Sequence, residues 1–300
     1  MGSLKEIRNR IKTVKNTRKI TSAMSRIAAA RLVKAQHAAI AARPYGERLE
    51  DVVYDLMAAA DPAEGGALSP LMPRPARAGE VRRVALVLVT ADRGLCGGFN
   101  ANANRAARTF LAERKAQGYE VPVLTVGRKG KSYLSHERHA PFLQHHPSAE
   151  LETVIARAKD VAHEATALYT GEAEGGPVEA VFLIYNHFKS VLTQEVKVVQ
   201  LLPFETVARV GAPTASAVFE PDARSLLAHL LPVALESRIQ QALFNSVAAE
   251  IAARRMAMDS ATDNASELIG ELTLIYNRER QAAITKELME IIGGAEALKG

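Results

Sequence analysis

The chain has 300 residues, of which 48% are hydrophobic and 24% charged, enough for one large domain or two small ones. No run of 18 uncharged apolar residues occurs, and the first ten residues lack an apolar stretch, which argues against a transmembrane helix and a signal peptide. A single cysteine, Cys96, excludes an internal disulfide and a multi-cysteine zinc site. We therefore expect a soluble, cytoplasmic protein.

The net charge of +5 is unevenly distributed along the chain. Residues 1–43 hold eleven Lys or Arg and one acid, Glu6, for a local charge of +10, whereas the remainder holds 27 bases and 32 acids. A basic arm on a mildly acidic body indicates an anionic partner, which could be nucleic acid, a membrane surface or an acidic protein. A solvated helix face explains the same composition.

The first 59 residues predict one long helix. Ser3 and Glu6 form a capping-box pattern at its start, and Pro44 and Gly46 are candidate kinks. An apolar stripe with alternating steps of three and four residues runs through Leu4, Ile7, Ile11 and Val14. We expect the stripe then to shift and to continue through Ile20, Met24 and Ile27, as it does at a stutter in a coiled coil.

The last 90 residues predict a second long helix, from about Asp222 to a stop at Gly293-Gly294. Apolar residues recur at helical spacing in it, at Leu235, Ile239, Leu243, Val247 and Ile251. Ordinary helices average about 11–12 residues, so two helices of this length cannot fit inside a compact domain. We expect residues 211–300 to pair with residues 1–59 as a long antiparallel coiled coil.

The middle of the chain predicts an α/β body. Buried-strand patterns cover residues 84–90, 121–126, 178–185 and 193–202, and helical patterns cover about 100–117 and 150–170. Alternation of strands and helices indicates a mostly parallel sheet. We expect a Rossmann-like domain over residues 81–210, connected to the first helix by a linker rich in Pro, Gly and Ala at 60–80.

Two glycine-containing turns are candidate ligand sites. Residues 127–132 end in Gly-Lys-Ser like a phosphate-binding P-loop, but the position five before Gly130 is Thr125 where that loop needs glycine. A basic exposed turn is the favoured interpretation. Residues 92–100 follow the first strand, where open α/β sheets bind ligands, yet their glycines do not form a dinucleotide fingerprint.

Three further features are candidate sites. Cys96 could be a nucleophile, but no His/Asp pattern marks its partners, and a small buried residue is favoured. Four histidines could bind a metal, but a solvated loop is the better interpretation; they are His136, His139, His145 and His146. Polar residues in the last helix face either a polar partner or solvent; they are Asp259, Thr262, Asp263 and Asn264.

Three blocks of the sequence resemble a known family. They are residues 3–24, containing Val-Lys-Asn-Thr-x-Lys-Ile-Thr-x-Ala-Met; residues 92–98, Asp-Arg-Gly-Leu-Cys-Gly-Gly; and residues 257–264 together with 276–285, containing Ala-Thr-Asp-Asn and Tyr-Asn-Arg-x-Arg-Gln. In this order they resemble the gamma subunits of F-type ATP synthases, the central rotor stalk. The lack of a transit peptide before the first helix favours a bacterial member.

The resemblance implies a subunit without a catalytic site, cofactor or metal. Its expected partners are three alpha and three beta subunits around the shaft, the epsilon subunit and the membrane c-ring, at the cytoplasmic side of the bacterial inner membrane. It implies that the chain transmits torque between the c-ring and the catalytic beta subunits. A coiled-coil nucleic-acid-binding protein and an α/β nucleotide enzyme using residues 127–132 are the alternatives.

Motif matches also assign residues to roles. Arg280, Gln281, Thr285 and Met24 match positions of rotor–stator coupling, and the basic arm matches a shaft facing acidic beta-subunit loops. Phe219 and Glu220 are a candidate foot near the c-ring. A structural turn is expected at Asp92, Gly94, Cys96, Gly97 and Gly98. Ser25-Arg26 departs from the charged-Met pair usual after Met24, so local contacts there are in doubt.

Overall fold

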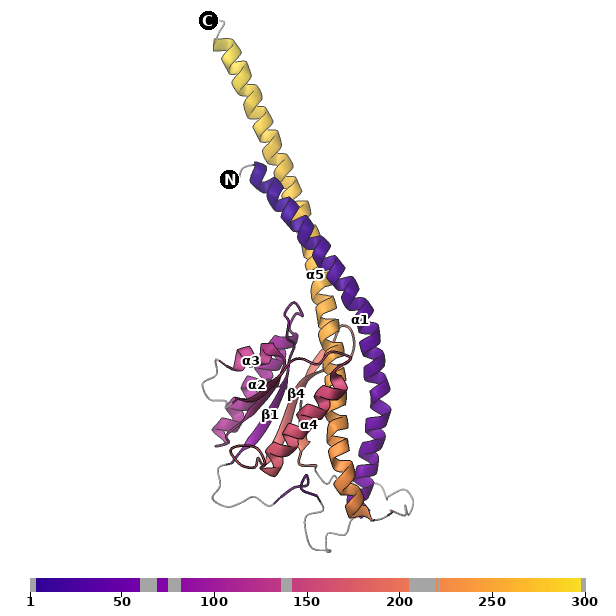
Figure 1. The fold of residues 1–300 in the computed structure, drawn as a ribbon. Helices are drawn as coiled ribbons and strands as arrows, with labels where there is room; N and C mark the ends of the chain where they lie inside the picture. Colours follow the sequence, from indigo (N-terminus) through magenta and orange to yellow (C-terminus); the bar gives the residue numbers. More distant parts are fainter. Residues whose placement is uncertain are drawn as a thin grey trace. The chain divides into compact units, whose positions relative to one another are not determined.

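The computed structural model describes residues 4–59, 69–74, 82–135, 142–204, 220 and 222–297. The elements in chain order are α1 (Leu4–Ala59), β1 (Val84–Val89), α2 (Phe99–Ala116), β2 (Val123–Val126), α3 (Arg128–Leu134), β3 (Phe142–His146), α4 (Val154–Thr170), β4 (Ala180–Phe188), β5 (Gln194–Leu202) and α5 (Ala223–Ala297) (Figure 1). The chain divides into two compact units, and both boundaries fall inside long helices. Unit 1 comprises residues 1–29 and 254–300, and unit 2 comprises residues 30–253.

Unit 2 contains one five-stranded sheet, in the order β3-β2-β1-β4-β5. The first four strands are parallel, and β5 is antiparallel to β4. All six residues of the central strand β1 are buried, as expected for a strand covered on both faces. The predicted mixed α/β fold, with a mostly parallel sheet and a long C-terminal helix, is confirmed.

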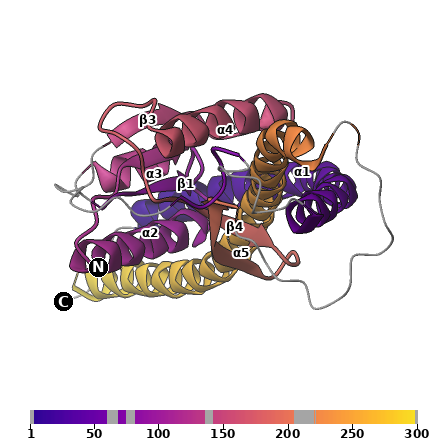
Figure 2. The same cartoon turned by 90° about the horizontal axis from the view of Figure 1, so that it is seen from below.

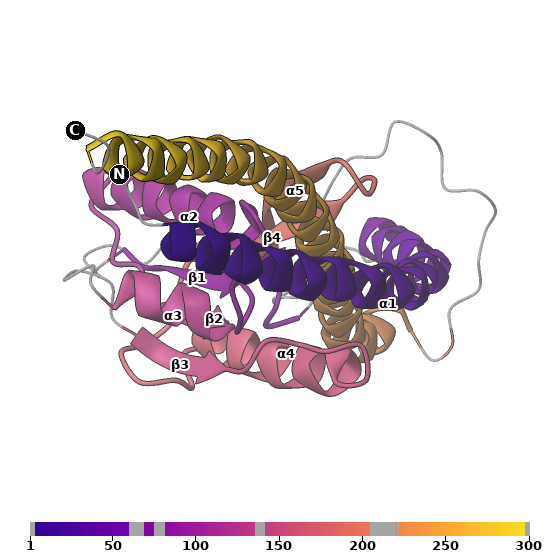
Figure 3. The same cartoon turned by 90° about the horizontal axis from the view of Figure 1, so that it is seen from above.

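Helices cover both faces of the sheet in unit 2 (Figures 2 and 3). One face packs against α2 and α3, with Phe110 of α2 tilted against Phe182 of β4 at 5.1 Å between ring centroids. The other face packs against α4 and against the parts of α1 and α5 that belong to this unit. Residues 69–74 join this second layer, because Leu71 and Met72 are buried in the same core.

The strand pattern missed two short elements, α3 and β3. Helix α3 has seven residues and contains Gly130, a poor helix former, so little local signal marks it. Tertiary hydrogen bonds hold it instead: the Gly130 amide donates to Thr90 Oγ1 at 2.8 Å, and the Lys129 amide donates to Ala91 O at 3.1 Å.

Both long helices continue through residues that usually interrupt helices. Helix α1 includes Pro44, and α5 includes Pro232. At Gly46 a Cβ atom would lie 1.4 Å from Gln241 Nε2, so glycine makes room for α5 inside unit 2. The predicted stop at Gly293-Gly294 was wrong, since α5 ends at Ala297. Each glycine costs a helix only about 1 kcal/mol, and no proline follows.

Candidate functional site

In unit 1, α1 and α5 pair along an antiparallel seam (Figure 1). The half-buried Leu4, Ile7, Ile11 and Val14 are followed by the exposed Arg18 and then, at the same three- and four-residue steps, by the buried Thr21, Ser25 and Ala28. On α5 the buried residues Met258, Ala265 and Leu272 recur every seven positions. This is the heptad repeat of a coiled coil, and it continues in one register.

The predicted shift of the stripe was therefore wrong. Ile20 is 61% exposed and Ile27 is 57% exposed, so neither lies in the seam. The seam keeps its register because the buried positions after Val14, Thr21, Ser25 and Ala28, are small or hydroxylated, and such residues let two helices approach closely. A prediction based on apolar character alone chooses Ile20 and Ile27, which are exposed neighbours of the buried Thr21 and Ala28.

The seam contains two polar contacts between the helices. Thr21 Oγ1 lies 2.7 Å from Thr262 Oγ1, and either hydroxyl can donate. One helical turn further, the Ser25 hydroxyl donates to Asp259 Oδ1, whose carboxylate also lies 3.8 Å from Arg255 Nε. Of the predicted polar residues of α5, Asp259 and Thr262 therefore face α1, whereas Asp263 and Asn264 are exposed.

Beside this seam, unit 1 has a shallow groove of about 630 Å³. It is lined by Arg18, Lys19, Ser22, Ala23, Arg26, Ile27, Thr262 and Ser266. Three of these residues are cationic and none is acidic, so the groove is suited to an anionic partner that also presents an apolar group. Met24, half-buried on the same helix, does not line the groove.

The end of α5 extends beyond its partner helix in unit 1. The antiparallel register places Leu4, the first described residue of α1, level with Glu279 and Arg280. Arg280 and Gln281 are exposed at this point, and the Thr285 hydroxyl donates to the Gln281 carbonyl at 3.0 Å. The predicted coupling residues of α5 thus lie together, at the point where α5 continues beyond the described part of α1.

Large aliphatic side chains are exposed along the same stretch. They are Leu274 and Ile275 on the paired part of α5, and Ile284, Leu288, Met289, Ile291 and Ile292 beyond Arg280, each at least 48% exposed. Within the described residues of unit 1, no helix covers this end after Arg280. Apolar surface of this extent on one helix end indicates a site that another protein covers.

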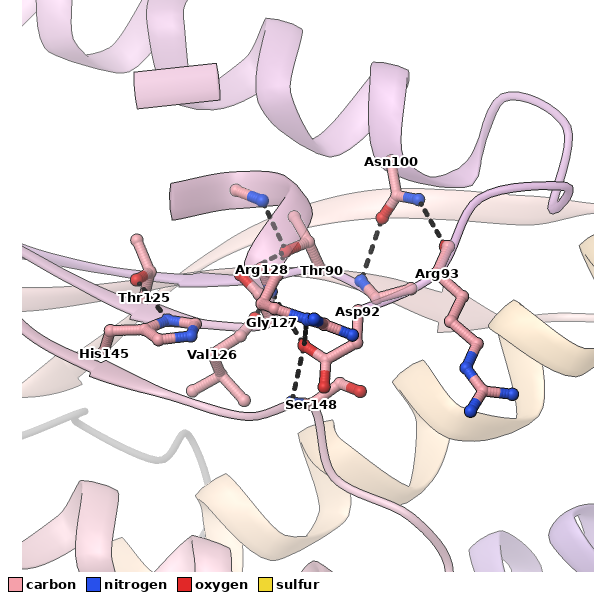
Figure 4. A network of polar contacts seen from close by, with 12 residues as sticks. Thr90, Asp92, Arg93, Asn100, Thr125, Val126, Gly127, Arg128, His145 and Ser148 are labelled. Atoms are coloured by element: carbon pink, nitrogen blue, oxygen red, sulfur yellow. Dashed lines mark hydrogen bonds and ion pairs between the residues drawn. The ribbon is translucent and has the colours of Figure 1, made fainter. Parts of the chain in front are cut away.

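In unit 2 the turn after β1 is fixed by Asn100 of α2 (Figure 4). Its Oδ1 accepts from the Ala91 amide at 2.9 Å, and its Nδ2 donates to Arg93 O at 3.3 Å and to Cys96 Sγ at 3.2 Å. Cys96 is buried against Phe99 and α5, so its thiol is not presented to solvent as a nucleophile would be. Gly94, Gly97 and Gly98 complete this turn and lie at the surface.

Asp92 joins the carboxyl ends of three strands (Figure 4). Its Oδ1 accepts from the Arg128 amide, which follows β2, at 2.8 Å, and from the Ser148 amide, which follows β3, at 3.2 Å. Open α/β sheets bind ligands at this edge. Here the Asp92 carboxylate accepts the hydrogen bonds of the two backbone amides to which an anionic ligand would otherwise bind.

The P-loop interpretation of residues 127–132 fails on the same geometry. Helix α3 begins directly after Gly127, whose φ of +101° turns the chain where a Cβ would lie 2.1 Å from Thr90 O. The following amides bond to acceptors of the chain, namely Asp92 Oδ1, Ala91 O, Thr90 Oγ1 and Gly127 O. No nest of unpaired amides is therefore available for a phosphate in this segment.

The histidines are separated by the structure. His136 and His139 lie outside the described residues. His145 Nδ1 lies 3.1 Å from Thr125 Oγ1, and burial followed by the nearby Lys131 charge lowers the pKa of His145. His146 lies 2.8 Å from Glu164 Oε1. Within the described part of the chain, no cluster of three His, Cys, Asp or Glu side chains could hold a metal ion.

A second groove of about 630 Å³, in unit 2, was not predicted from the sequence. It lies between α1, α5 and the strands β4 and β5, and contains the ion pair of Arg238 with Glu50 at 2.6 Å. Burial lowers the pKa of His187 at its wall, with further contributions from Lys197 and Arg43. No sequence pattern predicts it, because its residues come from four separate elements.

Together these features define a class of protein: a coiled coil with an uncovered apolar end, and an α/β unit whose ligand edge is closed by its own side chains. No helix among the described residues is sufficiently long and apolar to span a membrane. Of the predicted foot, Glu220 is an exposed bend residue and Phe219 lies outside the described residues.

Comparison with known proteins agrees with this class. The family model described as ATP synthase matches residues 3–298. The ATP synthase gamma chain of Geobacter sp. (strain M21) is 46% identical over 304 residues, with all of both chains covered, and that of Paracoccus denitrificans is 44% identical over 301 residues, with 99% and 100% covered. The chain therefore belongs to the ATP synthase gamma chain family.

Solved structures share the fold at lower identity. A chain of the Euglena gracilis mitochondrial ATP synthase, in the OSCP/F1/c-ring structure, matches with a TM-score of 0.65 at 16% identity, with 98% of this chain and 94% of that chain covered. A chain of the Tetrahymena thermophila mitochondrial ATP synthase central stalk/c-ring structure matches with a TM-score of 0.55 at 24% identity, with 81% and 99% covered.

Proposed function

We propose that this chain is the central rotor-stalk subunit of a bacterial proton-translocating F-type ATP synthase. In this role it has no catalytic site and transmits torque between the membrane c-ring and the catalytic beta subunits. The observation that carries the proposal is the end of α5, where aliphatic side chains such as Ile284, Leu288 and Ile291 are about half exposed or more. A surrounding ring of alpha and beta subunits would bury these exposed aliphatic side chains.

Torque requires contacts that differ between the states of each beta subunit, because a partner that binds all states equally shifts none of them. The groove of unit 1 provides a candidate contact, since Arg18, Lys19 and Arg26 would attract acidic beta-subunit loops. Ile27 in the same groove would add an apolar contact. Met24 lies on this helix at the position that the family resemblance assigns to coupling.

The exposed Arg280 and Gln281 are proposed to hydrogen-bond a loop of one beta subunit. They are suited to this role because the helix is single there, and because the Thr285 hydroxyl, which donates to Gln281 O, keeps an oxygen able to accept. At the other end of α5, Phe219 and Glu220 are proposed to contact the c-ring, beside the epsilon subunit. We propose that the assembled chain lies at the cytoplasmic side of the inner membrane, which protease accessibility in inverted membrane vesicles would test.

The test is the pair Arg280→Ala and Gln281→Ala in the assembled complex. We expect ATP-driven proton pumping to fall several-fold while assembly is normal, since hydrogen bonds to a charged group are worth about 1.5–3 kcal/mol. The matched control removes two exposed arginines of α2, Arg105→Ala with Arg108→Ala, and should pump normally. Unchanged pumping in the first variant would refute the coupling role. Recovery of the native chain without alpha and beta subunits would refute the rotor proposal itself.

A further inference from the structure

The groove in unit 2, called the unit 2 groove below, has a floor made by two antiparallel strands. The floor consists of Tyr185 and His187 of β4 with Lys197 and Val199 of β5. Tyr185 pairs with Lys197 in the register, and alternate residues of a strand point to the same face, so these side chains share one face of the sheet. Val199 packs in the core that contains α1 and α5, whereas Val196 packs on the opposite face. Lys197 therefore points toward the two long helices.

The walls of the unit 2 groove come from those helices. On α1 the lining residues recur at steps of four, three and four, which places them along one face of the helix. They are Arg43, Glu47, Glu50 and Tyr54, and α5 contributes Arg238, Gln241 and Asn245. The groove volume of about 630 Å³ is within the range of about 300–1,000 Å³ that small-molecule sites occupy. The fold thus builds a space of small-molecule size from four elements.

Two cations of the unit 2 groove have no counter-charge in the chain. Arg238 is neutralised, because its Nε lies 2.6 Å from Glu50 Oε1 and its Nη2 donates to the Tyr54 hydroxyl at 3.0 Å. Arg43 and Lys197 form no ion pair with any residue that the structure describes. Lys197 is also half-buried, and lysine is rarely buried without a partner. An anion from outside the chain would supply the missing charge.

His187 shows that these two cations lie near one point of the groove. Burial lowers the pKa of His187, and the positive charges of Lys197 and Arg43 lower this pKa further. Both cations are therefore within electrostatic reach of one imidazole. The His187 Nδ1 atom is buried and has no hydrogen-bond partner among the described residues, so nothing on the chain compensates for the positive potential at this ring.

We propose that the unit 2 groove binds a small ligand that carries one phosphate group, and that Arg43 and Lys197 hold this phosphate beside His187. A guanidinium binds two phosphate oxygens at once, and an ammonium adds a point charge. The remainder of the ligand would contact Tyr185 and Val199 on the floor. The inference goes beyond the proposed function and does not depend on it, since every residue belongs to unit 2 of this chain.

Glu47 limits the charge that the groove accepts. It follows Arg43 by one helical turn, lines the same groove and forms no ion pair among the described residues. A single phosphate can be held by the two cations at a distance from this carboxylate. A triphosphate would bring further negative charges against Glu47 and Glu50, so the proposal does not extend to ATP.

The first test is a titration of the full chain with inorganic phosphate and with phenyl phosphate at physiological salt, followed by NMR. We expect saturable binding with a Kd on the order of 1 mM for at least one of the two probes. Arg43→Gln with Lys197→Gln should weaken binding at least tenfold, because two charged hydrogen-bond donors are lost. The matched control removes two exposed cations of α2, Arg105→Gln with Arg108→Gln, and should bind as the unaltered chain does.

Equal weakening in the two double variants would show nonspecific attraction and would overturn the proposal. Absence of saturation in the unaltered chain up to about 20 mM would overturn it as well. Tighter binding of phenyl phosphate would assign a phosphate monoester as the ligand, and equal affinities would assign free phosphate; both results support the site.

A second variant gives an expected gain that misfolding cannot produce. Glu47→Gln removes the unpaired carboxylate and should tighten phosphate binding about two- to threefold, the size expected for one exposed charge. Affinity that is unchanged or weaker in Glu47→Gln would contradict the placement of the phosphate next to Arg43.

The imidazole of His187 locates the bound ion. The charged groups that face it are Arg43 of α1, Lys197 and Glu195 of β5, and Lys189 of the turn before β5. Saturating phosphate should raise the pKa of His187, because it neutralises Arg43 and Lys197; His187→Gln assigns the NMR signal. The pKa should not change when phosphate is added to the variant that lacks both cations. Saturable binding that leaves the pKa of His187 unaltered in the natural sequence would place the ion elsewhere and overturn the proposal.

Discussion

The Ser25 hydroxyl of α1 donates a hydrogen bond to the Asp259 carboxylate of α5 across the seam of unit 1. Ser25 is buried, and Asp259 is also within 3.8 Å of Arg255 on its own helix. The contact gives Ser25 a specific role: it fills a seam position with a small side chain and satisfies an acidic group on the partner helix.

Asp259→Ala should therefore destabilise the helix pair. The Ser25 hydroxyl would lose its acceptor, at a cost of about 1 kcal/mol in the free energy of unfolding. Asp259→Asn retains an acceptor oxygen and loses only the exposed pair with Arg255, so its cost should stay below about 0.5 kcal/mol. Urea unfolding followed by circular dichroism measures both. Equal losses in the two variants would mean that charge, and not the hydrogen bond, matters here.

Asp92 offers a similar comparison in unit 2. Asp92→Ala removes the acceptor of the Arg128 and Ser148 amides and should cost about 1–3 kcal/mol. Asp92→Asn keeps an oxygen for the same amides and should cost clearly less. The readout is the urea midpoint together with hydrogen exchange at the two amides. Exchange that stays slow in Asp92→Ala would show that the carboxylate does not hold the strand ends together.

These two aspartates show where sequence reasoning succeeds and where it stops. The long helices and four of the five strands were predictable, because each is marked by a periodic pattern of apolar residues within its own segment. The seam position of Thr21 was also present in the three- and four-residue steps from Val14, but hydrophobicity favoured Ile20 next to it. The buried Thr21 hydroxyl has a partner on its own helix, Arg18 O at 3.1 Å, and a second across the seam, Thr262, which is 241 positions away and has no local pattern.

The ligand edge of the sheet could be predicted only in part. Residues 92–98 were identified as a turn, but the bond from Ser148 to Asp92 spans 56 positions and has no local pattern. Helix α3 and strand β3 depend on such bonds, which explains why periodicity missed them. The positive φ of Leu95 was not predictable either, since leucine is among the residues least expected there.

Acid should destabilise the chain through His145. Burial and Lys131 lower the pKa of His145 below its ordinary 6.5, so the folded chain resists a proton that the unfolded chain accepts. Stability is therefore lost as the pH falls through 6.5 toward the lower, folded-state pKa, and is constant with respect to this group above 6.5. The urea midpoint should drop less between pH 7.5 and pH 5.5 in His145→Gln than in the unaltered chain. An identical drop would contradict this origin.

The isolated chain should not bind ATP specifically. Residues 127–132 resemble the end of a P-loop, yet the amides of Arg128, Lys129 and Gly130 already donate to Asp92, Ala91 and Thr90. A triphosphate could meet only exposed cations such as Lys131, which gives weak attraction that salt screens. Calorimetric titration with Mg·ATP at physiological salt should show no saturable heat up to about 1 mM. The decisive comparison is Lys131→Ala: a saturable isotherm in the unaltered chain that this substitution abolishes would restore the nucleotide-site hypothesis. Heat that is equal in both chains and disappears at high salt would reflect only the basic surface.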